Sequence, residues 1–186
     1  MFTENDGKFL LEYARKAIIE YLEFNKQIAI PAEIPDKFLE NLGVFVTINK
    51  NNQLRGCIGY SHPVDSLIEL TISSAIAAGF EDPRFPSLSP DEIKDIKLEI
   101  TILTKPELIK IYKPSEYFDH IKVGKDGLIV EKGYNKGLLL PQVATEYGWD
   151  AKEFLEETCQ KAGLPKDAYL EIDTLIYKFQ GLIFKE

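Results

Sequence analysis

The residues best suited to chemistry lie in the stretch 54–60, where one position separates an arginine from a cysteine. Side chains alternate between the two faces of a strand, so Arg55, Cys57 and Gly59 would share a face. A guanidinium beside a thiol favours the thiolate, which is the nucleophilic form of cysteine. Gly59 would leave that face open. Together with Gly56 it indicates a bulge, a bend or another backbone at close range.

Cys57 also has a plainer interpretation, because cysteine is often buried and packs as a small hydrophobic side chain. Arg55 would then simply pair with a carboxylate. Cys159 falls on the apolar face of an expected helix, which predicts a packing role. Two cysteines so far apart indicate no disulfide framework and fit a reducing compartment.

A second unusual segment is 82–86, in which two prolines flank an arginine and a phenylalanine. The prolines rigidify the loop and hold Arg84 and Phe85 in a fixed direction. A preset arginine suits a carboxylate or phosphate. The plainer interpretation inserts Phe85 into the core and leaves Arg84 in solvent. His62 is expected at a helix start or on the surface, rather than as a base for Cys57.

Several kinds of chemistry lack a motif in this sequence. It has no Gly-rich phosphate loop, no Gly-x-Ser-x-Gly elbow, no His-Glu-x-x-His and no Cys-x-x-Cys. Two histidines and two cysteines leave few ligands for zinc, so we expect no metal site, and no cofactor is indicated. Thirty acidic against 22 basic residues give a net charge of −8, which disfavours nucleic acid as a partner.

The sequence also bears on location and domain organisation. No apolar run approaches the roughly 20 residues needed to cross a bilayer, and the N-terminal residues do not resemble a signal peptide. We therefore expect a cytoplasmic protein that does not bind membranes. A chain of 186 residues, 45% of them hydrophobic, suits one compact domain over 1–186, with two lobes sharing a core.

Local patterns predict an α+β fold, because helices and strands mix without a strict βαβ repeat. The sheet is expected to be largely antiparallel or mixed, with flanking helices. Small residues at 73–78 indicate a helix packed closely on a sheet. Periodicity, capping and turn residues predict helices at 8–25, from Ser61 and Pro63 to 79, at 89–92 and at 150–163; strands at 43–48, 53–60, 98–102, 121–124, 128–132, 137–140 and 174–185; and turns at 49–52, 126–127 and 135–137.

The stretches 54–59 and 82–86 resemble motifs of the AMMECR family, whose microbial members are called AmmeMemoRadiSam system protein A. Three more segments, 140–143, 148–150 and 161–164, resemble family motifs in the same order, so the resemblance covers nearly the whole chain. It implies an α+β fold with a larger and a smaller subdomain around a groove. It also implies a Memo-like protein and a radical S-adenosylmethionine protein as partners.

One position departs from the family pattern. The resemblance implies a histidine in the turn that this chain builds from residues 124–127, where Asp126 stands instead. The position therefore offers no imidazole, although a carboxylate can accept a proton or bind a cation.

Two functions remain open from the sequence. In the first, an accessory protein uses Arg55, Cys57, Arg84 and Phe85 to dock a partner protein or a small anionic ligand. We favour it, because the sequence offers no convincing base for Cys57. In the alternative, an enzyme uses Cys57 as nucleophile or redox thiol, Arg55 promotes the thiolate, and Arg84 holds an anionic substrate. Further candidate ligand contacts are Gly56, Gly59, His62 and Asp126.

Overall fold

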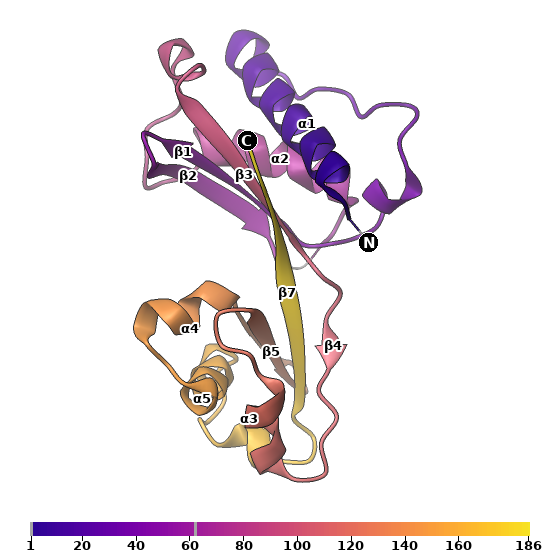
Figure 1. The fold of residues 1–186 in the computed structure, drawn as a ribbon, viewed down its shortest axis with the longest axis vertical. Coiled ribbons are helices and arrows are strands. Elements are labelled where there is room, and N and C mark those ends of the chain that lie inside the picture. The colour runs from indigo at the N-terminus through magenta and orange to yellow at the C-terminus, as the bar shows by residue number, and fades with distance from the viewer. Residues whose placement is uncertain (1, 62) are drawn as a thin grey trace. The chain divides into compact units, whose positions relative to one another are not determined.

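The computed structural model describes residues 2–61 and 63–186 (Figure 1). The chain forms two compact units, one of residues 1–103 with 182–186 and the other of residues 104–181. Helices combine with antiparallel strand pairs, which confirms the predicted α+β class. Each unit has its own hydrophobic core. The groove implied by the family resemblance stays a prediction.

The first unit is built on strands in the order β2, β1, β3 and β7, so β2 lies at an edge. Thr47 of β1 is opposite Cys57 of β2 and Glu99 of β3. Only the last residues of β7 belong to this unit. Its elements are α1 (Glu4–Phe24), β1 (Val44–Lys50), β2 (Gln53–Tyr60), α2 (Leu67–Phe80), β3 (Ile96–Leu103) and the end of β7 (Leu175–Lys185), with 3-10 helices at Asp36–Phe38 and Pro90–Glu92.

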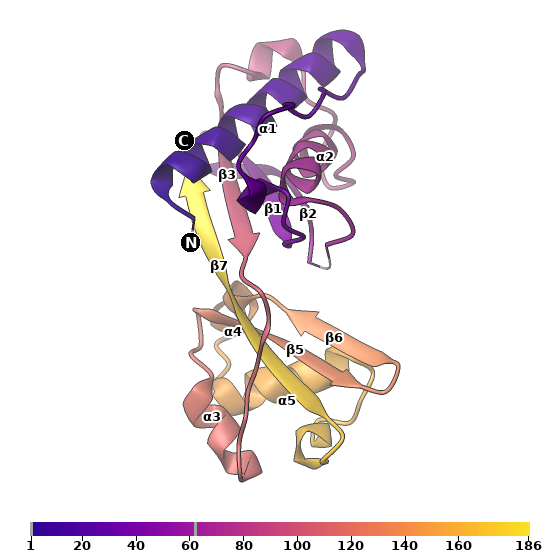
Figure 2. The ribbon, with the colours of Figure 1, turned by 90° about the vertical axis from the view of Figure 1, so that its right-hand side faces the viewer.

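The two faces of this sheet differ because buried and more exposed side chains alternate along its strands. On β1, Val44, Val46 and Ile48 are buried, whereas Thr47 between them is partly exposed. The buried side chains form one core with the apolar residues of α1 and α2. Figure 2 shows α1 crossing in front of β3. The opposite side, which we call the open face, carries polar residues such as Thr47 and Glu99.

Helix caps explain where the first unit departs from expectation. Helix α1 starts earlier than predicted, because Thr3 and Asp6 form a capping box at its N-terminus. Helix α2 starts at Leu67 rather than near Pro63, because Ser66 caps it and accepts a hydrogen bond from the backbone N–H of Glu69. The sequence prediction chose the proline and overlooked the serine.

The second unit packs a small sheet in the order β6, β5, β7 and β4 against helix α5. Leu128 and Val130 of β5 meet Phe154 and Leu155 of α5 in its core. Its elements are β4 (Glu107–Leu108), α3 (Tyr117–His120), β5 (Asp126–Lys132), β6 (Asn135–Leu139), α4 (Pro141–Tyr147), α5 (Ala151–Lys161) and most of β7, with 3-10 helices at Pro114–Glu116 and Ala168–Leu170.

Three predictions for the second unit are wrong. Residues 121–124 are no strand, and Asp126 begins β5 instead of forming a hairpin turn, because Gly124 supplies the turn with a φ of +79°. The next turn lies at 133–134 rather than 135–137, since Gly133 has a φ of +58°. Helix α4 was not predicted. By contrast, α5 has the predicted Asp150 cap and capping box.

Candidate functional site

The two glycines of β2 are required by close packing. A Cβ on Gly56 would lie 2.0 Å from the carbonyl oxygen of Ala78, because α2 passes directly over the strand. A Cβ on Gly59 would lie 2.3 Å from the carbonyl oxygen of Val44 on β1. Close approach of another backbone is observed at both glycines. An irregularity of the β-bulge kind also lies beside Gly56, because the β1–β2 register shifts between the pairs Ile48–Gly56 and Asn49–Leu54.

Cys57 lies on the open face of the first unit and is partly exposed. The Thr47 hydroxyl on the neighbouring strand donates a hydrogen bond to Cys57 Sγ over 3.2 Å. On β3, Glu99 is opposite Thr47, and its carboxylate forms an ion pair of 2.7 Å with the Lys185 ammonium. Cys57, Thr47, Glu99 and Lys185 therefore form a polar row across the open face.

The loop 82–86 holds the backbone of Cys57 from the free edge of β2. The Asp82 carboxylate accepts from the Cys57 N–H over 2.9 Å, and Arg84 Nη2 donates to the Cys57 carbonyl oxygen over 3.1 Å. Arg84 also binds Asp82 through Nε (2.9 Å) and Nη2 (2.7 Å). The Arg84 guanidinium, helped by the Cys57 N–H, holds the pKa of the buried Asp82 carboxyl well below its usual range.

The prediction that Arg84 and Phe85 are held in place agrees with this geometry. The Arg84 side chain is 54% exposed at its outer side, and its guanidinium carbon lies 5.5 Å from the centre of the Phe85 ring. The Phe85 backbone N–H donates to the Asp82 carbonyl oxygen and closes the turn. Arg84 is thus fixed by its own loop rather than free in solvent.

Arg55 forms the carboxylate pair that the sequence allowed. Its Nε and Nη2 donate to the two carboxylate oxygens of Glu92, each over 3.0 Å, and the side chain is only 12% exposed. Lys50 adds an ion pair of 2.9 Å to the same carboxylate. The hydrogen bonds from Arg55, followed by Lys50, lower the pKa of Glu92 to about 2. The charge of Arg55 is therefore matched by Glu92.

Asp126 and Cys159 both lie in the second unit. Asp126 belongs to the second unit and is 1% exposed; it accepts hydrogen bonds from the Lys122 N–H and from Gln180 Nε2. These bonds fix the turn before β5. His62 lies outside the described residues. Cys159 is fully buried in the second core, and burial raises the pKa of its thiol to about 11, consistent with packing.

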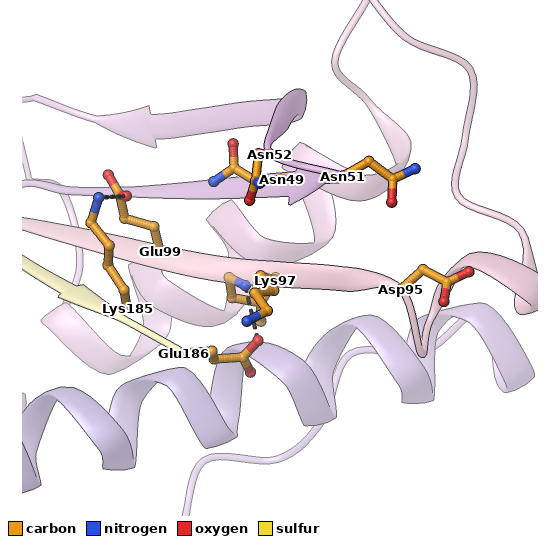
Figure 3. Close-up of a pocket in the computed structure, with 9 residues that line it drawn as sticks. Asn49, Asn51, Asn52, Asp95, Lys97, Glu99, Lys185 and Glu186 are labelled. Atoms are coloured by element: carbon orange, nitrogen blue, oxygen red, sulfur yellow. Dashed lines mark hydrogen bonds and ion pairs between the residues drawn. The ribbon is translucent and has the colours of Figure 1, made fainter.

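Sequence reasoning missed a hollow on the open face of the first unit, close to the β1–β2 turn (Figure 3). Its volume is about 600 Å³, and polar side chains dominate its walls. The sequence signal for this hollow was a run of asparagines around the β1–β2 turn, together with charged residues that alternate with apolar ones along β3. The lining residues are Asn49, Asn51, Asn52, Asp95, Lys97, Leu98, Glu99, Lys185 and Glu186.

Two searches of the described part of the chain complete the survey. Residues 2–61 and 63–186 contain no group of three or more His, Cys, Asp or Glu side chains placed to hold a metal ion. Within the same ranges, no helix is long and apolar enough to span a bilayer.

The fold and the residues around Cys57 define an α+β protein whose first-unit sheet carries polar residues on the face opposite its core. The sequence matches the AMMECR1 family over residues 11–184, and the chain belongs to this family. A Methanothermobacter thermautotrophicus protein is 50% identical over 99% of this chain and 96% of its own length. A Pyrococcus furiosus protein is 52% identical over 97% of this chain and 88% of its own. The crystal structure of an uncharacterised Pyrococcus horikoshii protein shares 51% identity, with a TM-score of 0.77 over 97% of this chain and 91% of that chain.

Proposed function

We propose that this chain is an accessory binding protein that docks a partner protein at the part of the open face around Cys57, where β2 meets the loop 82–86. The Memo-like and radical S-adenosylmethionine proteins implied by the family resemblance are the proposed partners. One observation carries the proposal: the Asp82–Arg84 pair fixes both backbone polar groups of Cys57 from the strand edge. The thiol, Arg84 and Phe85 are therefore presented in one preset arrangement, which lowers the entropy cost of docking.

A protein partner fits this surface better than a small anion does. Arg55 and Arg84 each hold a carboxylate of this chain through two guanidinium nitrogens. An incoming anion would have to displace these charge-assisted hydrogen bonds, which are strong. A protein partner can leave both pairs intact and contact the outer side of Arg84 and the Phe85 ring. Arginine and aromatic side chains are enriched at protein interfaces.

Docking is also favoured over catalysis by the partner that the Cys57 thiol has. Among the described residues, the hydrogen bond to its sulfur comes from the Thr47 hydroxyl, which donates rather than removes a proton. The enzyme alternative retains one supporting observation. Arg84 lies beside Cys57, with Nη2 3.1 Å from its carbonyl oxygen, and could attract an anionic substrate.

Binding of the purified chain to the Memo-like protein and to the radical S-adenosylmethionine protein of the same genome, measured by biolayer interferometry, tests the proposal. Phe85→Ala should weaken binding by about tenfold, as expected for an aromatic interface anchor. The matched control is Phe24→Ala, because Phe24 is exposed at the end of α1. Binding should be unchanged in the control.

Absence of binding to both proteins would overturn the choice of partners. An equal effect of Phe24→Ala and Phe85→Ala would overturn the choice of surface. The enzyme alternative makes a different prediction. A covalent adduct on Cys57, found by intact mass measurement of protein purified from native cells and lost in Cys57→Ser, would favour catalysis.

A further inference from the structure

The second unit carries an exposed aromatic pair in a segment that the docking surface around Cys57 does not use. Tyr147 is the last residue of α4, and Trp149 lies just before α5 (Figure 1). Their rings stack almost in parallel, with centroids 4.8 Å apart and an interplanar angle of 15°. Tyr147 is 69% exposed. One face of its ring therefore rests on Trp149, and the other face is left to solvent.

The local backbone holds this pair in place. Gly148 between the two residues ends α4 with a φ of +69°, in the left-handed region that glycine adopts readily. The Trp149 backbone N–H donates to the Ala144 carbonyl oxygen over 2.9 Å. The Trp149 ring is partly buried and packs against the core of the second unit. Tyr147 is thus presented on a ring that the core anchors, which lowers the entropy cost of binding.

The charges next to the aromatic pair are negative. Glu146 and Asp150 flank it in sequence, and the Glu153 carboxylate lies beside Asp150, because it accepts a hydrogen bond from the Asp150 N–H over 3.0 Å. All three residues are exposed, and none forms an ion pair with another described residue. Consecutive Cα atoms are about 3.8 Å apart, and charges act over a Debye length of about 8–10 Å. The flanking carboxylates therefore favour a cationic ligand at the rings.

The lysines closest to this segment leave that negative charge in place. Lys152 is already paired within α5. The basic turn 122–125 meets α4 at another point, because a Cβ on Gly124 would lie 3.0 Å from Thr145 Cγ2. Thr145 and Tyr147 are two positions apart on α4, which is about 200° around a helix. The basic turn and the Tyr147 ring therefore lie on different sides of α4.

We propose that the Tyr147–Trp149 pair is a docking point for a basic segment of a partner protein, with an arginine of that segment stacked on the free face of the Tyr147 ring. A guanidinium is planar and stacks on aromatic faces, whereas an ammonium is a compact and strongly hydrated charge. Proline-rich segments also bind exposed aromatic side chains, but they gain nothing from the flanking carboxylates. The pair lies in the second unit and shares no residue with the docking surface around Cys57.

The chain has one tryptophan, so its intrinsic tryptophan fluorescence reports on Trp149 alone. The probes are tetra-arginine and tetra-lysine peptides with blocked ends and equal charge. Tetra-arginine should change the fluorescence saturably and bind about threefold more tightly than tetra-lysine, roughly the size of one cation–π contact at an exposed site. The net charge of −8 attracts both peptides alike, so the difference between them isolates the contact with the ring.

Variants separate the ring from the charges, with the anisotropy of dye-labelled peptides as the readout. Tyr147→Ala should remove the preference for arginine, and Tyr147→Phe should keep it. Glu146→Gln should weaken the binding of both peptides equally, because it removes charge alone. Tyr134→Ala is the matched control, since Tyr134 is fully exposed in the turn before β6 of the same unit. This control should bind both peptides as the wild type does.

Several outcomes would overturn the proposal. One is the absence of a saturable change at up to about 10 mM tetra-arginine, tenfold above a weak millimolar dissociation constant. Others are equal binding of the two peptides and an equal effect of Tyr134→Ala and Tyr147→Ala. Saturable binding of tetraproline in place of tetra-arginine would assign the pair to proline-rich segments instead. If Tyr147→Ala lowers the thermal midpoint, the two peptides on the wild type and on Tyr147→Phe still decide. None of these results bears on docking at Phe85.

Discussion

The carboxylate of Asp82 accepts a hydrogen bond of 2.9 Å from the backbone N–H of Cys57, which lies at the edge of the first unit's sheet. Arg84 completes the arrangement by donating to the carbonyl oxygen of the same residue. An unpaired strand edge can recruit another strand, and proteins commonly block such edges with charged side chains. At Cys57, the Asp82–Arg84 side-chain pair makes the backbone hydrogen bonds that a neighbouring strand would otherwise make.

Asp82→Ala should therefore both destabilise the first unit and expose its edge. The substitution removes the acceptor of the Cys57 N–H and leaves Arg84 without its partner. We expect a loss of about 1–3 kcal/mol in the free energy of unfolding, measured by urea denaturation. Light scattering should detect self-association. The exposed Asp91 provides the control, and an effect of Asp91→Ala as large as that of Asp82→Ala would contradict the edge-capping role.

Acid should destabilise the first unit through Glu92 and Asp82. The pKa of Glu92 is about 2 in the folded chain against an ordinary value of 4.5, and that of Asp82 is lowered as well. Because folding lowers these pKa values, the stabilisation is fully present above pH 4.5. It is lost as pH falls toward 2. Glu92→Gln should flatten the fall in thermal midpoint below pH 4.5. Glu33→Gln, an exposed control, should reproduce the wild-type curve.

Local patterns predicted much of the fold because several elements depend on residues close in sequence. Strand β2 was predicted with its observed ends, and the Asp150 cap located helix α5. The errors arose where two local signals competed. Pro63 was chosen over Ser66 as a helix start, and Asp126 was read as a turn although Gly124 makes it. Helix α4 was missed although its Pro141 start and left-handed Gly148 end are standard signals.

The candidate site was less predictable, because its contacts join distant segments. Alternation along β2 predicted that Arg55 and Cys57 share a face, but the pairing register skips Arg55 between Leu54 and Gly56, so the alternation is interrupted there. Alternation also could not show which carboxylate Arg55 would find. Glu92 and Asp82 become partners only when the loop after α2 folds back onto the strand edge. The polar hollow depends on β1, β3 and the end of β7 together. No short sequence window contains that information.

Gly56 should tolerate no side chain. A methyl group at this position would lie 2.0 Å from the Ala78 carbonyl oxygen, a backbone atom that cannot move without shifting α2. Gly56→Ala should lower the free energy of unfolding by about 3 kcal/mol or more, and Gly56→Val should prevent folding. Leu54→Ala, at an exposed position on the same strand, is the control. A thermal midpoint unchanged in Gly56→Ala would show that the strand and helix are further apart than described.

Thiol labelling should distinguish the two cysteines. Cys57 is partly exposed on the open face, whereas Cys159 is fully buried and its thiol has a pKa raised to about 11. Brief iodoacetamide treatment of the native chain at neutral pH should therefore modify Cys57 and spare Cys159, as read by mass spectrometry of the peptides. Denaturation should make both accessible, which serves as the control for intrinsic reactivity. Equal and slow labelling of both in the native chain would make Cys57 a packing residue and remove it from the docking surface. Protection of Cys57 by a bound partner would connect the thiol directly to docking, because the partner would have to cover the open face to exclude the reagent.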